Sequence, residues 1–206
     1  MKLLLVHRYI KPDASGYAQM LYIIGQHLVS EGYDVTILSA QPRSSELLQG
    51  DSLPVRQRID GMTVIRLPIL DEAKRRPIAR AANAGWFALA LLAFGVTRRK
   101  KFDQIFVSTH PPLVMAAVAR LIKSLRGSGY VYHCMDLYPE IAVDSGILRS
   151  ERITLPLFKA IDKQNCKRAD KVVVLSSDMK KTIAARDESV DNVLSLIHIS
   201  EPTRPY

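Results

Sequence analysis

The chain has 206 residues, 48% of them hydrophobic, and its 29 basic and 20 acidic side chains give a formal net charge of +9 at pH 7. This length is enough for one α/β domain with a core of its own, and the ordinary apolar content excludes an intrinsically disordered chain. Cys134 and Cys166 form no CxxC motif and no metal-binding spacing with a histidine, so no metal site is predicted. We expect a reduced, cytoplasmic setting.

The first forty residues form the most complete structural pattern. Residues 2–6 are a continuous apolar run, typical of a central parallel strand, and residues 17–28 repeat apolar side chains at helical spacing. Gly32 ends that helix, and a second strand is predicted at residues 33–38. Such a unit places the N–H groups of a helix N-terminus at the carboxyl edge of a parallel sheet, where α/β proteins bind phosphorylated ligands. The chemistry is therefore expected at strand ends.

The rest of the chain continues this alternation of strands and helices. Asp60-Gly61 is a tight-turn dipeptide and predicts a turn between two short extended runs. Further strands are predicted at residues 63–67, 102–109, 130–133 and 171–175 (the last one), and helices after Pro111-Pro112, over residues 153–167 and after a Ser176 cap. The predicted fold is α/β, with a Rossmann-like parallel sheet flanked by helices.

Residues 81–96 are apolar enough to suggest a membrane span, but the pattern favours a helix of the domain. The stretch between Arg80 and Arg98 is at the lower length limit for crossing about 30 Å of hydrocarbon. A crossing would also separate strands that must pair in one sheet. Two alternatives stay open: a helix packed on the domain, and a helix in the membrane interface with Trp86 and Phe87 dipped in.

The positive charge is concentrated around this apolar segment. Between Lys74 and Lys101 the chain has several basic residues and no acidic one. Each basic side chain near an anionic leaflet contributes about 1 kcal/mol. We therefore expect an anionic membrane surface as a partner of the 74–101 region, a possible peripheral location on the inner face of the cell membrane, and no nucleic-acid partner.

The end of the chain departs from the pattern. Residues 194–204 resemble, residue for residue, the in-frame translation of a transposase-type sequencing adapter, and Pro205-Tyr206 would be index sequence. We expect one domain over residues 1–190, a non-native tail over residues 194–206, and a missing C-terminal donor-binding domain. The alternative is a natural strand followed by a polar tail.

Polar side chains gather where the predicted strands end, and most densely at residues 133–140. Tyr138 offers a stacking face, and Asp136 and Glu140 offer carboxylates to hydroxyl groups. A sugar acceptor needs such groups: acceptors for its hydroxyls, an apolar face for its ring and a base near the attacking oxygen.

Five segments together resemble the N-terminal domain of family-four glycosyltransferases, which have the GT-B fold. They are Pro12–Gly16, Glu31–Leu38, Ser108–Leu113, Asp136–Glu140 and Lys167–Ser176. The resemblance covers residues 1 to about 190. The fourth segment resembles the corresponding segment of those family members that build O-antigen and other surface polysaccharides. The resemblance implies that the chain is the N-terminal half of a retaining transferase. Such an enzyme moves a sugar from a nucleotide-sugar donor to a hydroxyl of a glycan or lipid-linked acceptor, without a metal or other cofactor.

The resemblance also implies the donor contact of this half. Gly16, preceded by Ser15, stands where the first loop of the family approaches the donor diphosphate. Many members carry paired glycines there, whereas this chain has Ala14-Ser15-Gly16. A glycine needed only for the turn is the alternative. Most nucleotide contacts belong to the second domain of the family, so the chain alone is expected to be inactive.

On the acceptor side the resemblance points to residues after the later strands. Asp136 matches an acidic position of the family and is predicted to act as a catalytic or acceptor-orienting carboxylate, with His110 and Glu140 as further site residues. A turn cap is the alternative for Asp136. Met135 stands where relatives often have a basic residue, and His133 is the nearest replacement.

Two other classes of function remain as alternatives. One is a dinucleotide-dependent oxidoreductase, although the first loop lacks G-x-G-x-x-G and the second strand ends in Leu38-Ser39 without an acid. The other is a membrane-associated, non-catalytic binding module that is complete as written. Such a module would be a stable, ligand-competent monomer.

Overall fold

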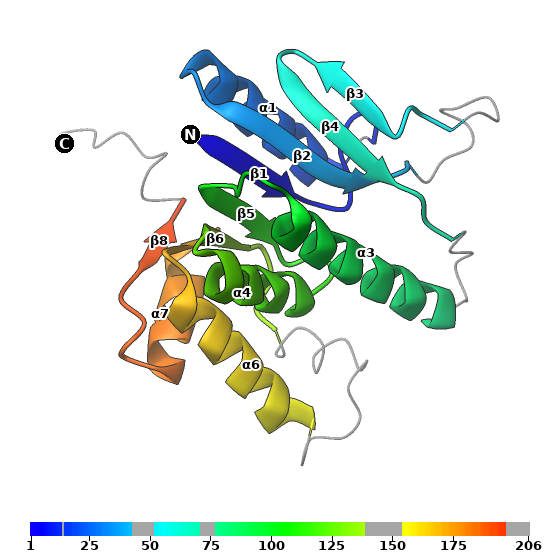
Figure 1. The fold of residues 1–206 in the computed structure, drawn as a ribbon. Coiled ribbons are helices and arrows are strands. Elements are labelled where there is room, and N and C mark those ends of the chain that lie inside the picture. Colours follow the sequence, from blue (N-terminus) through cyan, green and yellow to red (C-terminus); the bar gives the residue numbers. More distant parts are fainter. Residues whose placement is uncertain (14, 43–51, 71–76, 139–153, 197–206) are drawn as a thin grey trace. The chain divides into compact units, whose positions relative to one another are not determined.

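A computed structural model describes residues 1–13, 15–42, 52–70, 77–138 and 154–196 (Figure 1). The chain forms two compact units, residues 1–106 with 121–128, and residues 107–120 with 129–206. The strands are β1 (Lys2–Val6), β2 (Asp34–Ala40), β3 (Arg56–Ile59), β4 (Met62–Leu67), β5 (Gln104–Ser108), β6 (Gly129–Cys134), β7 (Lys171–Val174) and β8 (Val193–Ser195). The helices are α1 (Gly16–Ser30), α3 (Pro77–Thr97), α4 (Val114–Arg126), α6 (Thr154–Arg168) and α7 (Ser177–Arg186).

The strands follow the order β3-β4-β2-β1-β5-β6-β7-β8 in one sheet. Pairs β1–β2, β2–β4, β6–β7 and β7–β8 are parallel, and β3 joins β4 antiparallel through a hairpin. The predicted α/β fold with a mostly parallel sheet is therefore confirmed. The strand order reverses at β1, which has β2 on one side and β5 on the other. Ligands of open α/β sheets bind outside the carboxyl ends of strands at such a switch point.

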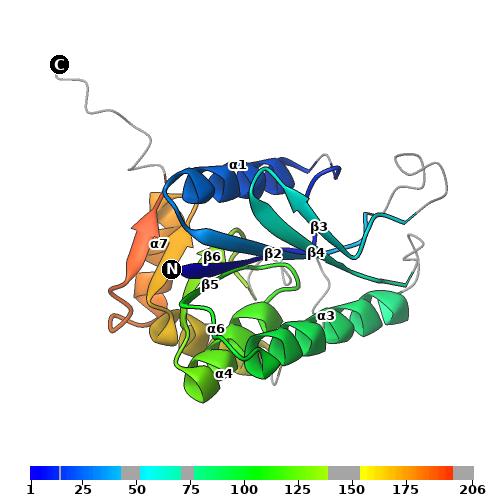
Figure 2. The ribbon, with the colours of Figure 1, turned by 45° about the horizontal axis from the view of Figure 1, so that its top comes forward.

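In the first unit, α1 and α3 lie on opposite faces of the strands (Figure 2). The core forms between α1 and the sheet because the helix turns Ala18, Leu21, Tyr22 and Gly25 inward. Two of them join Ile10 of the loop after β1 and apolar side chains of β1, β2 and β4 in one cluster: Leu3, Leu5, Ile10, Leu21, Tyr22, Val35, Ile37, Met62 and Val64. Burying each large apolar side chain stabilises the unit by about 1.5–3 kcal/mol.

The turn predictions of the first unit are confirmed. Asp60 and Gly61 both have positive φ, 46° and 81°, as a type I′ hairpin turn requires. The phenol of Tyr22 on α1 donates to the Asp60 carboxylate, which ties the hairpin to the helix. Gly32 has φ 83° and follows the last turn of α1, where the N–H of Tyr33 donates to the Leu28 carbonyl at 3.0 Å.

Helix α3 packs through one side and exposes the other. Phe87 and Leu91 are buried, whereas Trp86 and Leu89 are 48% and 64% exposed. Asn83 fixes the packed side by donating to the Leu70 carbonyl and accepting from its N–H, both at 2.8 Å. By length and composition residues 79–97 would also suffice to cross a membrane, and 22% of that window is buried. Helix α3 thus contributes apolar side chains to the core and also exposes an apolar surface.

The second unit differs from the sequence predictions at two places. The helix expected to open at Pro111-Pro112 begins at Val114, because Leu113 has φ 61° and its carbonyl accepts from the N–H of Ala117. The strand at 171–174 is not the last, since β8 pairs with β7. Strand β8 crosses the predicted start of the non-native tail, with Val193 and Ser195 buried. Ser176 caps α7 as predicted, accepting from the N–H of Met179 at 3.2 Å.

Candidate functional site

The loop between β1 and α1 leads directly to the first candidate residues. Ser15 is the N-cap of α1, and its hydroxyl accepts from the N–H of Ala18 at 3.2 Å. The Ser15 side chain therefore satisfies one of the four N–H groups that a helix leaves open at its start. Gly16 is the first helical residue and is exposed. The remaining N–H groups of the first turn and the positive end of the helix dipole lie next to it.

Gly16 has no conformational reason to be glycine. Positive φ occurs at Gly32, Gly61 and Gly127, and not at Gly16. A Cβ built on Gly16 meets no heavy atom of the described residues within 4 Å. Among the described residues, neither the turn nor the packing therefore requires glycine, and the position that a Cβ of residue 16 would take is open.

The path of this loop is set by residues that the sequence analysis did not single out. The Arg8 carbonyl accepts from the hydroxyl of Ser39 at 2.9 Å and from the N–H of Ala40 at 3.0 Å. Arg66, on β4, is 1% exposed and donates to the Lys11 carbonyl at 3.0 Å. Burial lowers the pKa of the Arg66 guanidinium, and the charge of Asp13 opposes this shift. The loop is thus held from two neighbouring strands before it reaches Ser15.

His7 and Tyr17 show why this end of β1 is well packed. His7 is buried, and its ring centroid lies 4.2 Å from that of Tyr17 and 5.7 Å from that of Tyr9. His7 is therefore part of the packing at the end of β1. It also seats Tyr17, the residue after Gly16, against the end of the strand.

In the second unit, His110 follows β5 and is exposed. Three residues later the chain makes a γ-turn, in which the N–H of Val114 donates to the Pro112 carbonyl at 2.6 Å across Leu113. The side-chain amide of Asn165, on α6, donates to the Leu113 carbonyl at 3.0 Å. His110 thus precedes a turn that is anchored from a distant part of the sequence.

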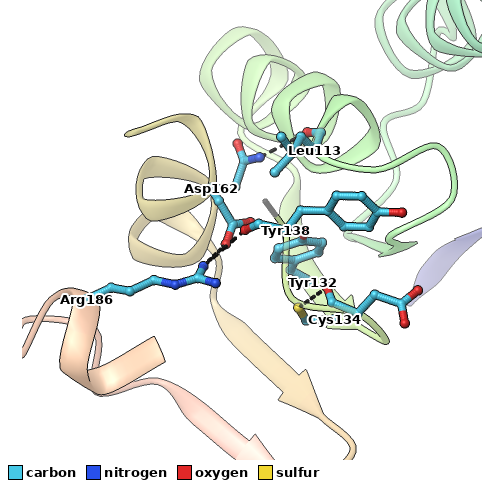
Figure 3. A network of polar contacts seen from close by, with 8 residues as sticks. Leu113, Tyr132, Cys134, Tyr138, Asp162 and Arg186 are labelled. Atoms are coloured by element: carbon cyan, nitrogen blue, oxygen red, sulfur yellow. Dashed lines mark hydrogen bonds and ion pairs between the residues drawn. The ribbon is translucent and has the colours of Figure 1, made fainter. Parts of the chain in front are cut away.

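Asp136 follows β6, and the segment after this strand is anchored through Cys134 and Arg186, both labelled in Figure 3. The Asp136 carbonyl accepts from the Cys134 thiol at 3.2 Å, and burial raises the pKa of that thiol, which keeps it protonated and able to donate. The Asp136 side chain is half-buried. Burial first, and then the negative charge of Asp136, raises the pKa of Tyr138. Glu140, the third predicted carboxylate of the acceptor site, lies outside the described residues.

A buried ion pair supports the same segment. Arg186, on α7, donates through Nη1 to the Tyr138 carbonyl at 3.2 Å and to Asp162 Oδ2 at 2.6 Å. Tyr132 also donates to Asp162, at 3.3 Å. Burial, followed by the charge of Asp162, holds the pKa of the Tyr132 phenol well above its usual value. The main chain near Asp136 is therefore attached to both α6 and α7.

His133 does not supply the basic group that relatives often carry beside the acidic position. It is 1% exposed, and burial lowers its pKa from 6.5 to about 4. At neutral pH its imidazole is uncharged. His133 is thus a buried histidine in the core of the sheet.

The structure gathers the candidate residues in two groups. Ser15 and Gly16 lie together at the start of α1, in the first unit. His110 and Asp136 belong to the second unit and follow β5 and β6, which are neighbours in the strand order. Among the described residues no three His, Cys, Asp or Glu side chains are grouped as a metal site requires, and a metal-free reaction stays a prediction.

The family comparison bears directly on these residues. Residues 15–194 match the glycosyl transferase 4-like domain. The chain belongs to this family. The prediction from the five motif segments is confirmed, and the match decides against the dinucleotide-dependent oxidoreductase. The chain is also 27% identical over 125 residues to a probable glycosyltransferase, WbjE, of Pseudomonas aeruginosa, an alignment that spans 61% of this chain and 29% of WbjE.

Solved structures agree with this glycosyltransferase fold. A sucrose-phosphate synthase from Thermosynechococcus elongatus has a TM-score of 0.61 at 15% identity, with 90% of this chain and 45% of that one covered. Anabaena Alr3699/HepE, solved with UDP-glucose, has a TM-score of 0.55 at 14% identity, with 95% and 43% covered. Arabidopsis thaliana UGT89C1, solved with UDP, has a TM-score of 0.54 at 12% identity, with 100% and 53% covered.

At these identities the likeness establishes the fold alone. The chain has the Rossmann-like α/β architecture of GT-B enzymes, as predicted. It spans 29% of WbjE and 45% of the synthase. Donor, acceptor and activity of a whole enzyme are therefore matters for proposal.

Proposed function

We propose that this chain serves, together with a donor-binding domain, to transfer a sugar from a nucleotide-sugar to a hydroxyl of a glycan or lipid-linked acceptor with retention. The main structural support is the N-terminus of α1, which is open at Gly16 and follows the strand where the sheet order reverses. A helix N-terminus at such a switch point favours a phosphorylated ligand. UDP-sugar and UDP occur in two of the similar structures. The donor diphosphate is therefore assigned to Ser15 and Gly16.

The acceptor is assigned to the residues after β5 and β6. Asp136 accepts a hydrogen bond from the attacking hydroxyl and orients it, and the Tyr138 ring offers an apolar face for the sugar. His110 and Glu140 complete the polar lining in this proposal. No metal or other cofactor takes part. The proposed reaction takes place in the cytoplasm. The nucleotide-sugar is a substrate of this reaction and not a cofactor.

The transfer reaction is tested in a protein that carries both domains. The full reading frame, recovered by long-read sequencing of the source DNA, is expressed and assayed with a panel of nucleotide-sugars and with membrane-extracted acceptors. Asp136→Asn is expected to lower kcat by about 10²–10⁴-fold, the usual contribution of a positioned acid or base. Asp178→Asn is the matched control, because it makes the same change at an exposed carboxylate on α7. Full activity of Asp136→Asn would remove Asp136 from the reaction.

The same sequencing tests the proposed domain limits. We expect native codons to replace the present ones from about residue 194 and to continue into the donor-binding domain. The isolated 206-residue chain is expected to show no turnover with any nucleotide-sugar. Sugar transfer by the isolated chain would contradict the proposed division of labour between two domains.

A membrane surface is proposed as the second partner. Helix α3 exposes Trp86 and Leu89, and Arg80 at its start and Arg99 after its end are exposed cations. An apolar stripe with basic flanks is suited to lie in the interface of an anionic leaflet. A complete, non-catalytic membrane-binding module is the second candidate function, and the same exposed stripe supports it. Turnover by the two-domain protein separates the two candidates.

Liposome binding tests the membrane proposal. Binding of the chain is expected to rise with the content of anionic lipid and to fall with salt. Leu89→Glu is expected to weaken binding about tenfold or more, since it removes an apolar contact and adds repulsion. Leu157→Glu is the matched control, because Leu157 on α6 is 54% exposed and far from the basic segment in the sequence. Equal losses for both variants, or binding indifferent to lipid charge and salt, would contradict the proposal.

A further inference from the structure

Helix α6 has no residue among the candidate site residues, yet its buried side carries two strongly polar side chains. Asp162 is 1% exposed and Asn165 is 0% exposed. The two are three positions apart and therefore share one face of the helix. Buried carboxylates and amides are costly unless they are hydrogen-bonded. Their partners show what this face of α6 does.

Asn165 holds the turn that follows His110. Its side-chain amide donates to the Leu113 carbonyl at 3.0 Å. Leu113 has φ 61°, a left-handed conformation that leucine rarely adopts, and it is the centre of the γ-turn before α4. A conformation of this kind persists only where surrounding contacts impose it. Asn165 supplies such a contact from a helix about fifty residues away in the sequence.

Asp162 holds the segment that carries Asp136 indirectly, through Arg186. Its Oδ2 accepts from Arg186 Nη1 at 2.6 Å, and the same nitrogen donates to the Tyr138 carbonyl at 3.2 Å (Figure 3). The carboxylate is 1% exposed and the guanidinium side chain 15%. The charge of Asp162 thus fixes the guanidinium, and the guanidinium fixes the main chain two residues after Asp136.

We infer that α6 is the positioning element of the acceptor side: Asn165 sets the turn after His110, and Asp162 with Arg186 sets the segment that carries Asp136. Neither Asn165 nor Asp162 acts on the substrate. Because His110 and Asp136 are site residues only in the proposed sugar transfer, the functional meaning of this inference depends on that proposal. A site needs such support from rigid elements to keep its reactive groups in place.

The inference is tested by hydrogen–deuterium exchange of the 206-residue chain with two variants. Asn165→Leu removes the donor to Leu113, whose carbonyl still accepts from the N–H of Ala117. It is expected to raise exchange about tenfold in residues 107–117 and to leave residues 131–138 unchanged. Arg186→Lys keeps a charge beside Asp162, but the shorter side chain lacks the Nη1 that donates to both Asp162 and the Tyr138 carbonyl. It is expected to raise exchange about tenfold in residues 131–138 alone, with the urea midpoint unchanged.

Two control variants remove contacts of α6 that reach neither loop. Tyr130→Phe deletes the hydroxyl that donates to the Asn165 carbonyl at 2.5 Å. Lys163→Ala deletes the 3.1 Å ion pair with Asp187, which also joins α6 to the end of α7. Neither control is expected to change exchange in residues 107–117 or 131–138 relative to the rest of the chain.

Two results would overturn the inference. One is a uniform rise in exchange for Asn165→Leu or Arg186→Lys, which would show a general loss of stability rather than positioning. The other is the same loop-selective rise in the controls. Either result leaves the proposed sugar transfer intact, because the Asp136→Asn assay tests it independently. Conversely, full activity of Asp136→Asn would not alter the exchange pattern.

Discussion

Replacing Arg186 by methionine is expected to lower the free energy of unfolding by about 3–5 kcal/mol, the usual cost of removing one partner of a buried ion pair. Methionine keeps most of the packing of the side chain but removes the cation beside Asp162, whose side chain is 1% exposed. The carboxylate then stays in the interior without the charge that offset its desolvation. Domains of this size are stable by about 5–15 kcal/mol, so the loss is a large share of the total. Urea unfolding followed by circular dichroism measures it.

The reverse change gives a sharper test of this explanation. Asp162→Asn leaves the guanidinium of Arg186, which is 15% exposed and therefore nearer to solvent. Its cost is expected to be smaller, about 1–2 kcal/mol for the weakened hydrogen bonds. The double variant should cost less than the sum of the two single ones, because the two side chains interact. An Arg186→Met variant as stable as Asp162→Asn would contradict the buried-charge explanation.

Lys163 provides the matched control for this prediction. It lies next to Asp162 on α6 and pairs with Asp187 at 3.1 Å, but its side chain is 45% exposed. Lys163→Met is expected to cost less than about 1 kcal/mol, because the lysine is solvent-exposed and the Asp187 side chain that it leaves is 14% exposed, against 1% for Asp162. The contrast between the two pairs tests the burial of the carboxylate left without its cation.

Most of the fold could be predicted because its signals are local. The continuous apolar run at 2–6, the Asp60-Gly61 turn, the Gly32 helix stop and the Ser176 cap all correspond to observed features. The start of α4 could not be predicted, because the γ-turn at Leu113 depends on Asn165 of another helix. Strand β8 was missed because it lies where the sequence resembles adapter, and three residues carry little pattern.

The buried polar residues that support the candidate site could have been recognised from their positions in the sequence. Arg66 falls on the same side of β4 as Met62 and Val64, so period-two alternation places it inward. Asp162 and Asn165 fall on the apolar stripe of α6 by the 3.6-residue period. A charged or amide side chain at such a position indicates a buried partner. The partner itself cannot be deduced, since it comes from a distant segment.

The alternation of strands and helices predicted that His110 and Asp136 follow the ends of strands, and the structure shows that these strands, β5 and β6, are neighbours. The alternation of strands and helices does not determine the protonation state of residues close to His110 and Asp136. His133 looked like a candidate basic group because it precedes Asp136 by three positions, but burial decides its charge. This difference has a measurable consequence for stability.

The chain is expected to lose about 3 kcal/mol of stability as the pH falls from about 6.5 to about 4, through the protonation of His133 in the unfolded chain. Burial lowers the pKa of His133 from 6.5 to about 4 in the folded protein, so the folded state keeps the imidazole neutral over this interval. The unfolded chain takes up a proton below pH 6.5 and is thereby stabilised. The contribution of His133 is fully present above the unfolded pKa and declines as the pH drops towards the folded one.

Urea unfolding at several pH values between 7.5 and 4 measures this dependence. His133→Gln removes the titrating group, and the difference in unfolding free energy between wild type and variant should shrink as the pH falls. His27→Gln makes the same change on an exposed side chain of α1 and is the control for the substitution itself. If the His133→Gln difference stayed constant, the imidazole would have to be protonated or solvated in the folded sheet. A charged group would then lie three positions before Asp136, and the neutral environment inferred for the end of β6 would be wrong.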